Sequence, residues 1–277
     1  MEMDINSPVI VTALYNIGRD EWDKFTQSYD GYLQWLYRTL SLDSNIIIYT
    51  QERFKDQILD YRSKYDNNLE KTHIVIQELE DIYCYKKYNQ PLEDLMYSDE
   101  FKKKLSFPDV PEASRPLYNV IMFNKVFWLR HAVENNIFNN DMVLWLDAGG
   151  LRDNIEKYEN VNWPSLEQIN KQDTNRVTFF SHKLDFTITD EEREYISLSQ
   201  IRAIQGTAFL VPSHLIYNLC DEVEITINNS LRDKYIGSDE KIFDITYVRD
   251  KSKYSLIESD WREYFERLHC HSESSIQ

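Results

Sequence analysis

The sequence predicts an α/β fold in which a mostly parallel central sheet is flanked by helices. Short apolar runs alternate with longer helical patterns along the 277 residues, and this order is typical of parallel strands joined by crossover helices. The runs are apolar throughout and few hairpin signals separate them, as expected of strands that are buried on both faces. We expect a single domain over residues 1–277, because six Gly and seven Pro leave little material for a linker.

Each element follows from its local pattern. Apolar or β-branched runs predict strands at residues 9–14, 46–50, 73–76, 143–146, 177–182 and 207–211. Apolar residues at three- and four-residue spacing predict a helix near residues 29–40, and Trp261, Tyr264, Phe265 and Leu268 form a last amphipathic stripe. A polar helix is expected near residues 51–65, a helix that starts at Pro116 near residues 116–135, and two more near residues 213–231 and 239–248. Residues 83–115 lack either pattern and contain three prolines, which predicts a surface insertion or lid with one short helix. Residues 271–277 are expected to form a flexible tail.

The overall charge restricts the classes of partner. A formal net charge of -16 repels a polyphosphate backbone, so nucleic-acid binding is not expected. No secretory leader and no transmembrane segment is recognisable, which predicts a cytoplasmic protein. Three widely spaced cysteines form neither a disulfide framework nor a zinc motif.

The most informative segment is the apolar run that ends in Leu146-Asp147-Ala148-Gly149. It places a carboxylate at the carboxyl end of a buried strand, where ligands of α/β sheets collect. Asp147 either caps the following turn or binds a divalent metal or a ribose. Nucleotide-sugar transferases of the GT-A class often carry Asp-x-Asp here, whereas Gly149 replaces the second acid in this chain. A metal at Asp147 would therefore need another ligand, from His182, Asp185, Asp153 or water.

Two further segments carry candidate ligand-binding residues. The first strand ends in Thr12, Ala13, Leu14 and Tyr15, and Arg19 follows in a loop that could cradle a nucleotide, with Tyr15 stacking on its base. The same loop could also be a plain connection with a surface arginine. Asn124 and Lys125 interrupt the helix at residues 116–135, either as a structural amide and a solvated lysine or as ligand-binding groups. In this acidic chain, Arg19, Lys125 and Lys183 are the cations expected near a diphosphate.

Asp239 and Glu240 open a predicted helix, where acids favour the helix dipole whatever their function. Alternatively, either could be the general base that deprotonates an acceptor hydroxyl. Gly206 precedes an apolar strand and either makes an ordinary turn or lets the backbone approach a sugar. The chain has no Gly-x-Gly-x-x-Gly signature and no Walker loop, so it does not resemble dinucleotide-binding or P-loop proteins.

Taken in order, these motifs resemble those of the HtrL/YibB family, also called WlaTC-like, of bacterial and viral proteins regarded as glycosyltransferases. The resemblance rests on Val11-Thr12-Ala13, Ile17-Gly18-Arg19, Pro116-Leu117-Tyr118, Met122-Phe123-Asn124-Lys125 and Leu144-Trp145-Leu146-Asp147-Ala148-Gly149. It implies a GT-A-like fold, a nucleoside-diphosphate-sugar donor and a divalent metal, Mn²⁺ or Mg²⁺. Asp147 then matches the metal or ribose acid. The second metal ligand, for which we take His182, comes from the residues themselves and not from the resemblance. Thr12, Ala13 and Arg19 match the nucleotide loop, and Asn124 with Lys125 matches the helix motif.

The resulting hypothesis is transfer of a sugar to a hydroxyl of a glycan, lipid or protein. One alternative is a GT-A-like module that binds carbohydrate or a partner protein and has lost catalysis, which the missing second aspartate favours. The other is a phosphatase of the haloacid dehalogenase kind. That chemistry needs a second Asp where Gly149 stands. The sequence leaves the donor, the acceptor, the stereochemistry and the oligomeric state open.

Overall fold

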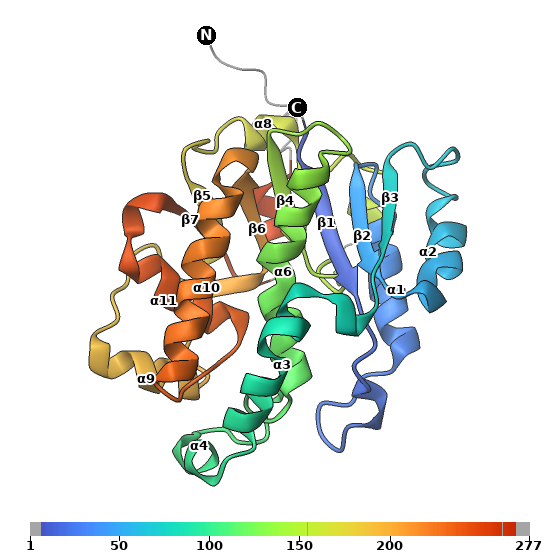
Figure 1. The fold of residues 1–277 in the computed structure, drawn as a ribbon. Helices are drawn as coiled ribbons and strands as arrows, with labels where there is room; N and C mark the ends of the chain where they lie inside the picture. The colour runs from blue at the N-terminus through green and yellow to red at the C-terminus, as the bar shows by residue number, and fades with distance from the viewer. Residues whose placement is uncertain (1–6, 154, 262, 270–277) are drawn as a thin grey trace.

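The computed structural model describes residues 7–153, 155–261 and 263–269 and shows a seven-stranded sheet with helices on both faces (Figure 1). The strand order is β3-β2-β1-β4-β6-β5-β7. All pairs are parallel except those of β6, which runs antiparallel to both of its neighbours. The strands are β1 (Val9–Leu14), β2 (Ile46–Thr50), β3 (Thr72–Ile76), β4 (Met142–Leu146), β5 (Val177–Ser181), β6 (Ile204–Pro212) and β7 (Tyr254–Glu258). The predicted mostly parallel α/β sheet is confirmed.

The α-helices are α1 (Tyr29–Leu40), α2 (Lys55–Arg62), α3 (Tyr83–Met96), α4 (Asp99–Lys104), α5 (Pro111–Ser114), α6 (Pro116–Asn135), α7 (Ile155–Tyr158), α8 (Leu166–Ile169), α9 (Asp190–Leu198), α10 (Ile216–Arg232), α11 (Asp239–Arg249) and α12 (Tyr264–Arg267). Short 3₁₀ helices are η1 (Arg19–Glu21), η2 (Glu52–Phe54), η3 (Leu79–Asp81), η4 (Ser213–Leu215) and η5 (Lys251–Lys253). Among the residues that the structure describes, no helix is long and apolar enough to cross a membrane.

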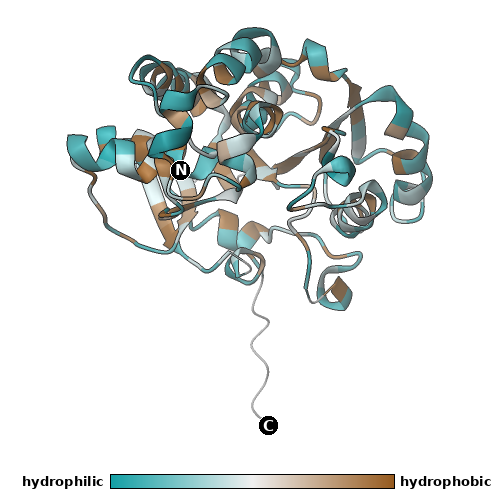
Figure 2. Ribbon diagram, turned by 90° about the horizontal axis from the view of Figure 1, so that it is seen from below, coloured by the Kyte–Doolittle hydropathy of each residue, from teal (hydrophilic) through white to brown (hydrophobic). Residues whose placement is uncertain are grey.

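Two hydrophobic cores lie on the two faces of the sheet, because successive strand residues point to opposite sides. Val9 and Val11 of β1 pack with α3, α6, α10 and α11 in the larger core, whereas Ile10 packs with α1, α2 and α12 in the other. Seen from below, apolar segments gather between the helices and polar segments lie outside (Figure 2). Burial on both faces explains why the strands read as continuous apolar runs.

Helix α6 matches the predicted range and supports the pocket at the carboxyl end of the sheet. Pro116 occupies its first turn, where a missing backbone N–H costs nothing. Asn136 ends the helix in the left-handed conformation, with a φ of 43°. The helix lies in the layer that covers β1 and β4, with Phe123, Phe127 and Trp128 buried beneath it. Because α6 is packed in this layer, the position of the Lys125 side chain is determined by the helix.

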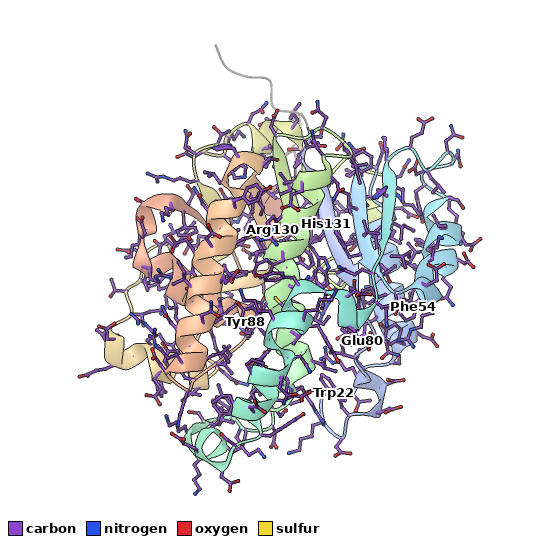
Figure 3. All side chains as sticks on the ribbon, viewed as in Figure 1. Trp22, Phe54, Glu80, Tyr88, Arg130 and His131 are labelled. Atoms are coloured by element: carbon purple, nitrogen blue, oxygen red, sulfur yellow. The ribbon has the colours of Figure 1, made fainter. Side chains whose placement is uncertain are left out.

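The prediction of one short helix within residues 83–115 is wrong, because this segment forms α3, α4 and α5. Four apolar residues of α3 are buried against the core, and they are spaced four apart: Cys84, Tyr88, Leu92 and Met96. Figure 3 labels Tyr88 within this layer. Pro91 lies inside the helix and, with the charged residues around it, hides the apolar spacing in the sequence. Tertiary packing outweighs the local proline penalty here.

Three other features were not predicted. Strand β7 pairs with β5 at the edge of the sheet, and α9 begins with a capping box formed by Thr189 and Glu192. The reversed direction of β6 was also unforeseen, because an apolar run reads the same in either direction. The tail expected at residues 271–277 lies outside the described residues.

Candidate active site

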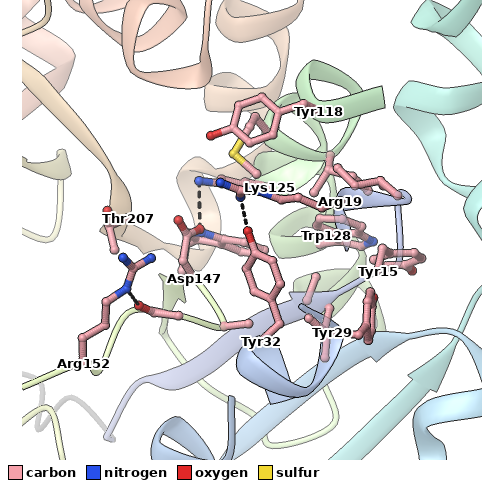
Figure 4. A pocket seen from close by; sticks show the side chains of 18 of the residues that line it. Tyr15, Arg19, Tyr29, Tyr32, Tyr118, Lys125, Trp128, Asp147, Arg152 and Thr207 are labelled. Atoms are coloured by element: carbon pink, nitrogen blue, oxygen red, sulfur yellow. Dashed lines mark hydrogen bonds and ion pairs between the residues drawn. The ribbon is translucent and has the colours of Figure 1, made fainter. Parts of the chain in front are cut away.

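A pocket of about 160 Å³ opens at the carboxyl ends of β1 and β4 (Figure 4). It is lined by the end of β1 and the loop that follows, by α1 and α6, by the end of β4 and the loop that follows, by Thr207 of β6, and by Trp261. Ligands of open α/β sheets bind at such an edge because the loops there are free to vary. We therefore take this pocket as the candidate active site.

Aromatic residues make up seven of the 19 that line the pocket. Tyr15 stacks on Trp128 with ring centroids 5.3 Å apart and an interplanar angle of 15°. Trp128 stacks in turn on Trp145, at 5.7 Å and 8°. The other aromatic lining residues are Tyr29, Tyr32, Tyr118 and Trp261. Trp128 and Trp145 are buried, so this stack makes that side of the pocket rigid.

Asp147 reaches the pocket because the chain turns sharply just after β4. The Gly150 N–H donates to the Asp147 carbonyl oxygen at 2.7 Å, which closes the turn. A Cβ at position 150 would lie 2.6 Å from Leu146 Cδ1, so glycine is required. The Asp147 side chain is 30% exposed and lies in the pocket wall.

Only one oxygen of the Asp147 carboxylate is used by the described part of the protein. Its Oδ1 accepts from Trp145 Nε1 at 2.7 Å and lies 2.8 Å from Lys125 Nζ. Among the described residues, none of the hydrogen bonds ends on Oδ2. The carboxylate is thus held in one orientation with an acceptor oxygen left over for a ligand.

Lys125 is a buried bridge between two carboxylates. Its Nζ lies 2.8 Å from Asp147 Oδ1 and 2.7 Å from Asp239 Oδ2, and it donates to the Gly206 carbonyl at 2.9 Å. These three contacts use all three donors of the ammonium group. The side chain is 2% exposed. Lys125 therefore has no donor left for the diphosphate contact that its sequence position predicted.

The charges of this bridge support one another. Burial by itself lowers the pKa of Lys125, but Asp147 and Asp239 together raise it above the usual lysine value. Burial raises the pKa of Asp147, and Lys125 opposes that shift. The ammonium consequently stays charged at neutral pH and favours an ionised carboxylate beside it.

Arg19 is placed by the loop after β1, which turns at Gly18 with a φ of 72°. Its Nε donates to the Phe25 carbonyl at 3.0 Å, and its Nη1 donates to the Tyr32 hydroxyl. Its guanidinium carbon lies 5.4 Å from the Trp22 ring centroid. Within the described part of the chain, no carboxylate lies within 4 Å of it. Arg19 keeps an uncompensated positive charge at the pocket.

A second arginine, Arg152, lines the pocket from the loop after β4. Its Nε donates to the Gly149 carbonyl at 2.7 Å, and its guanidinium lies 4.3 Å from the Trp35 ring centroid and 5.4 Å from that of Trp261. Again, no carboxylate among the described residues lies within ion-pairing distance. In a chain of net charge -16, this pocket keeps two arginines available for an anion.

The structure brings most of the predicted ligand-binding residues together and separates three. The predicted residues that line the pocket are Ala13, Tyr15, Arg19, Lys125, Asp147, Ala148 and Gly149. Thr12 and Leu146 are fully buried within their strands. Asn124 Oδ1 accepts from the Cys84 N–H at 2.9 Å at the start of α3. Thr12, Leu146 and Asn124 therefore serve packing and backbone hydrogen bonding in this structure.

The described residues do not assemble the predicted metal pair of Asp147 and His182. His182 follows β5, and β6 separates that strand from β4. Its Nδ1 lies 3.3 Å from Asp260 Oδ1, and Asp185 pairs with Lys251. No group of three or more His, Cys, Asp or Glu side chains among the described residues could hold a metal. One carboxylate that already contacts an ammonium does not fit a divalent ion.

Asp239 and Glu240, the predicted bases, begin α11 behind Lys125 and do not line the pocket. Asp239 is 3% exposed and points to the ammonium. Glu240 pairs with Arg202 at 2.8 Å. Burial and the neighbouring Asp239 raise the pKa of Glu240 to about 7, against the opposing effect of Arg202. A general base must reach its proton, so we assign neither residue that role.

Several residues that line the pocket were not predicted from the sequence. Arg152 had a usable signal, because it lies in the glycine-containing loop that follows the Asp147 strand. The sequence pattern identifies Tyr29 and Tyr32 only as part of a helix face, although they line the pocket. Trp261 comes from the far end of the chain, and no local pattern connects it with Asp147.

Gly206 makes room for the buried bridge. A Cβ at this position would overlap Asp239 Oδ2. We expect Gly206→Ala to lower the free energy of unfolding by about 2–3 kcal/mol, because the buried carboxylate has to move away from Lys125. Urea unfolding measures this, with Gly149→Ala as the control, since there a Cβ meets side-chain atoms only at 3.2 Å. If Gly206→Ala lost no more unfolding free energy than Gly149→Ala, this explanation would be contradicted.

Asp244 predicts a pH-dependent stability. Its carboxylate accepts from the Ala203 and Ile204 N–H groups at 2.9 and 2.8 Å. Burial nevertheless raises its pKa to about 7, so the folded protein keeps a proton that the unfolded chain releases near a pH of about 4. The free energy of unfolding should therefore fall as pH rises from about 4 to about 7. Urea titrations at a pH of about 5 and of about 7 should show a smaller difference in Asp244→Asn, and an unchanged difference would refute this assignment.

Comparison with known proteins agrees with the motifs. The family model described as "Bacterial protein of unknown function (HtrL_YibB)" matches residues 6–270. Protein HtrL of Escherichia coli (strain K12) is 21% identical over 287 residues, covering 98% of this chain and 94% of its own length.

Among solved structures, mouse xyloside xylosyltransferase 1 matches with a TM-score of 0.47 and 12% identity, over 90% of this chain and 84% of that one. The galactosyltransferase LgtC, solved with donor and acceptor sugar analogs, matches with a TM-score of 0.44 and 13% identity, over 90% and 72%. Because the family model spans nearly the whole sequence, this chain belongs to the HtrL_YibB family.

Proposed function

We propose that this protein transfers a sugar from a nucleoside-diphosphate donor to a hydroxyl group of a glycan, lipid or protein. One observation carries the proposal. A pocket with flat aromatic walls combines two arginines that have no carboxylate partner with one carboxylate oxygen that has no partner, among the described residues. In such a pocket the aromatic residues can contact a ring, the arginines can bind an anion, and the carboxylate oxygen can accept a hydrogen bond from a hydroxyl group.

The arginines would meet the leaving diphosphate. In the transfer, the acceptor oxygen bonds to the anomeric carbon, and the bond from that carbon to the phosphate oxygen breaks, with its electrons passing to the diphosphate. The proton of the acceptor hydroxyl passes to the departing diphosphate or to water. Arg19 and Arg152 carry the positive charge that stabilises this leaving group. Because only Nε of Arg152 is engaged in the hydrogen bonds of the described residues, both of its terminal nitrogens can donate to phosphate oxygens.

Asp147 would position a hydroxyl group. Its Oδ2 can accept a hydrogen bond from the donor sugar or the ribose, while Lys125 and Trp145 hold Oδ1. Orientation of this kind lowers the barrier because the reacting groups are already aligned. The more accessible aromatic lining residues would contact the base, and the stack of Tyr15, Trp128 and Trp145 keeps that side of the pocket rigid.

Calorimetry with UDP and with GDP tests the proposal. We expect one of the two to bind, and we expect Arg19→Gln and Arg152→Gln each to weaken binding by about 10–100-fold, because each removes a charge-assisted hydrogen bond to phosphate. Arg176→Gln is a matched control, since Arg176 lies outside the pocket and pairs with Asp173. Absence of binding to both nucleotides, with Mn²⁺ and with EDTA, would refute the proposed function.

A further inference from the structure

Three oxygen atoms converge on the Lys125 ammonium. Two belong to carboxylates, Asp147 Oδ1 at 2.8 Å and Asp239 Oδ2 at 2.7 Å, and the third is the Gly206 carbonyl oxygen at 2.9 Å. Carboxylate and backbone carbonyl oxygens are also the ligands that Mg²⁺, Mn²⁺ and Ca²⁺ prefer. Lys125 therefore fills a position whose surroundings resemble those of a hard metal ion.

We infer that the Lys125 ammonium is a built-in cation that takes the place of a divalent metal between Asp147 and Asp239. The pocket then binds a nucleoside diphosphate without a metal. The part of this inference that concerns the nucleotide rests on the proposed function, whereas the part that concerns Lys125 does not.

The surroundings of Lys125 are built to keep the ammonium in place. The side chain is 2% exposed, and the Asp239 side chain is 5% exposed. Gly206 leaves the space for that carboxylate, which a Cβ at this position would overlap. A divalent ion that approached Asp147 would meet a carboxylate whose Oδ1 already lies 2.8 Å from the ammonium, and the two positive charges would repel each other.

The pocket does not need a metal for its positive charge. Lys125, Asp147 and Asp239 together carry a net charge of -1. Arg19 and Arg152 add two positive charges, so the five side chains together have a net charge of +1. These two arginines have no carboxylate partner among the described residues, so their charge is available to a diphosphate. Together, the buried lysine and the two arginines supply the charge that a bound metal would bring.

The first test uses the unmodified protein. Mn²⁺ is titrated without nucleotide and followed by electron paramagnetic resonance. We expect the unmodified protein and Asp147→Asn to give the same titration, because no Mn²⁺ site depends on Asp147. The Kd for UDP or GDP should differ by less than about threefold between Mn²⁺ and EDTA. Loss of about tenfold or more in EDTA would overturn the inference, as would a Mn²⁺ site that depends on Asp147. If neither nucleotide binds, the proposed function fails, and the Mn²⁺ titration still decides the role of Lys125.

The second test removes the ammonium. Lys125→Ala should gain one Mn²⁺ site per chain and unfold at a higher temperature in Mn²⁺ than in EDTA. The site should disappear when Asp239→Asn is added. Lys241→Ala is the matched control, because Lys241 is also buried but its ammonium donates only to the Ser197 carbonyl, at 3.4 Å, among the described residues. If Lys125→Ala folds only with Mn²⁺, the inference is supported. A variant that gains no Mn²⁺ site, or that stays unfolded with Mn²⁺, would overturn it.

Discussion

Lys125→Met is expected to lower the free energy of unfolding by about 3 kcal/mol. The substitution keeps most of the length of the side chain but leaves Asp147 and Asp239 facing each other without a cation. Breaking a buried ion pair on one side costs about 3–5 kcal/mol, because a charge stays buried and unpaired. We expect the lower end of this range, since the Asp147 side chain is 30% exposed and water screens part of its charge.

Urea unfolding at neutral pH, followed by tryptophan fluorescence, measures this loss. Adding Asp239→Asn to Lys125→Met should restore part of the stability, because it removes one of the two unpaired carboxylates. Lys241→Met serves as the control for burial alone, since Lys241 is buried but has no carboxylate within 4 Å among the described residues. A loss below about 1 kcal/mol in Lys125→Met would show that the bridge contributes little to folding.

Asp147→Asn should reduce sugar transfer by about 100-fold or more while the protein stays folded. The amide oxygen can still accept from Trp145 and Lys125, so the side chain keeps its orientation. The amide nitrogen, however, replaces the free Oδ2 and presents a donor where the pocket offered an acceptor. Nucleotide affinity should change much less than turnover, because the two arginines proposed to bind the diphosphate are untouched.

Release of nucleotide from UDP-sugars and GDP-sugars, with and without acceptor, measures this effect. Asp185→Asn is a suitable control, since Asp185 pairs with Lys251 outside the pocket. Turnover in Asp147→Asn that equals the wild-type rate would remove Asp147 from the reaction. Tight nucleotide binding by the wild type with no release from any sugar donor would instead favour the module that binds carbohydrate and has lost catalysis.

The sheet and its main helix could be predicted because they depend on local patterns. Continuous apolar runs at β1, β2 and β4 report burial on both faces, and α6 carries its own start signal in Pro116. Helix α3 escaped prediction because its apolar spacing is hidden by charged residues and Pro91. The direction of β6 also escaped, because it depends on chain connectivity and not on the residues of the strand.

The site divides in the same way. Arg19 and Asp147 follow β1 and β4, which pair in parallel, so their positions after these strand ends could be assigned to one pocket from the sequence. The pairing of Lys125 with Asp239 joins residues 114 positions apart and depends on how α6 and α11 meet, which no local pattern reveals. That pairing changed the expected roles of both residues from ligand and base to a buried bridge.

A crystal structure of the protein with UDP or GDP and no added metal is the most direct test of the proposed site. We expect the diphosphate within hydrogen-bonding distance of Arg19 and Arg152, the base in contact with the aromatic lining of the pocket, and the ammonium of Lys125 still between its two carboxylates. A nucleotide bound elsewhere on the protein would contradict the proposed site. A diphosphate held to Asp147 through a metal ion, with Lys125 displaced, would contradict the role assigned to that lysine.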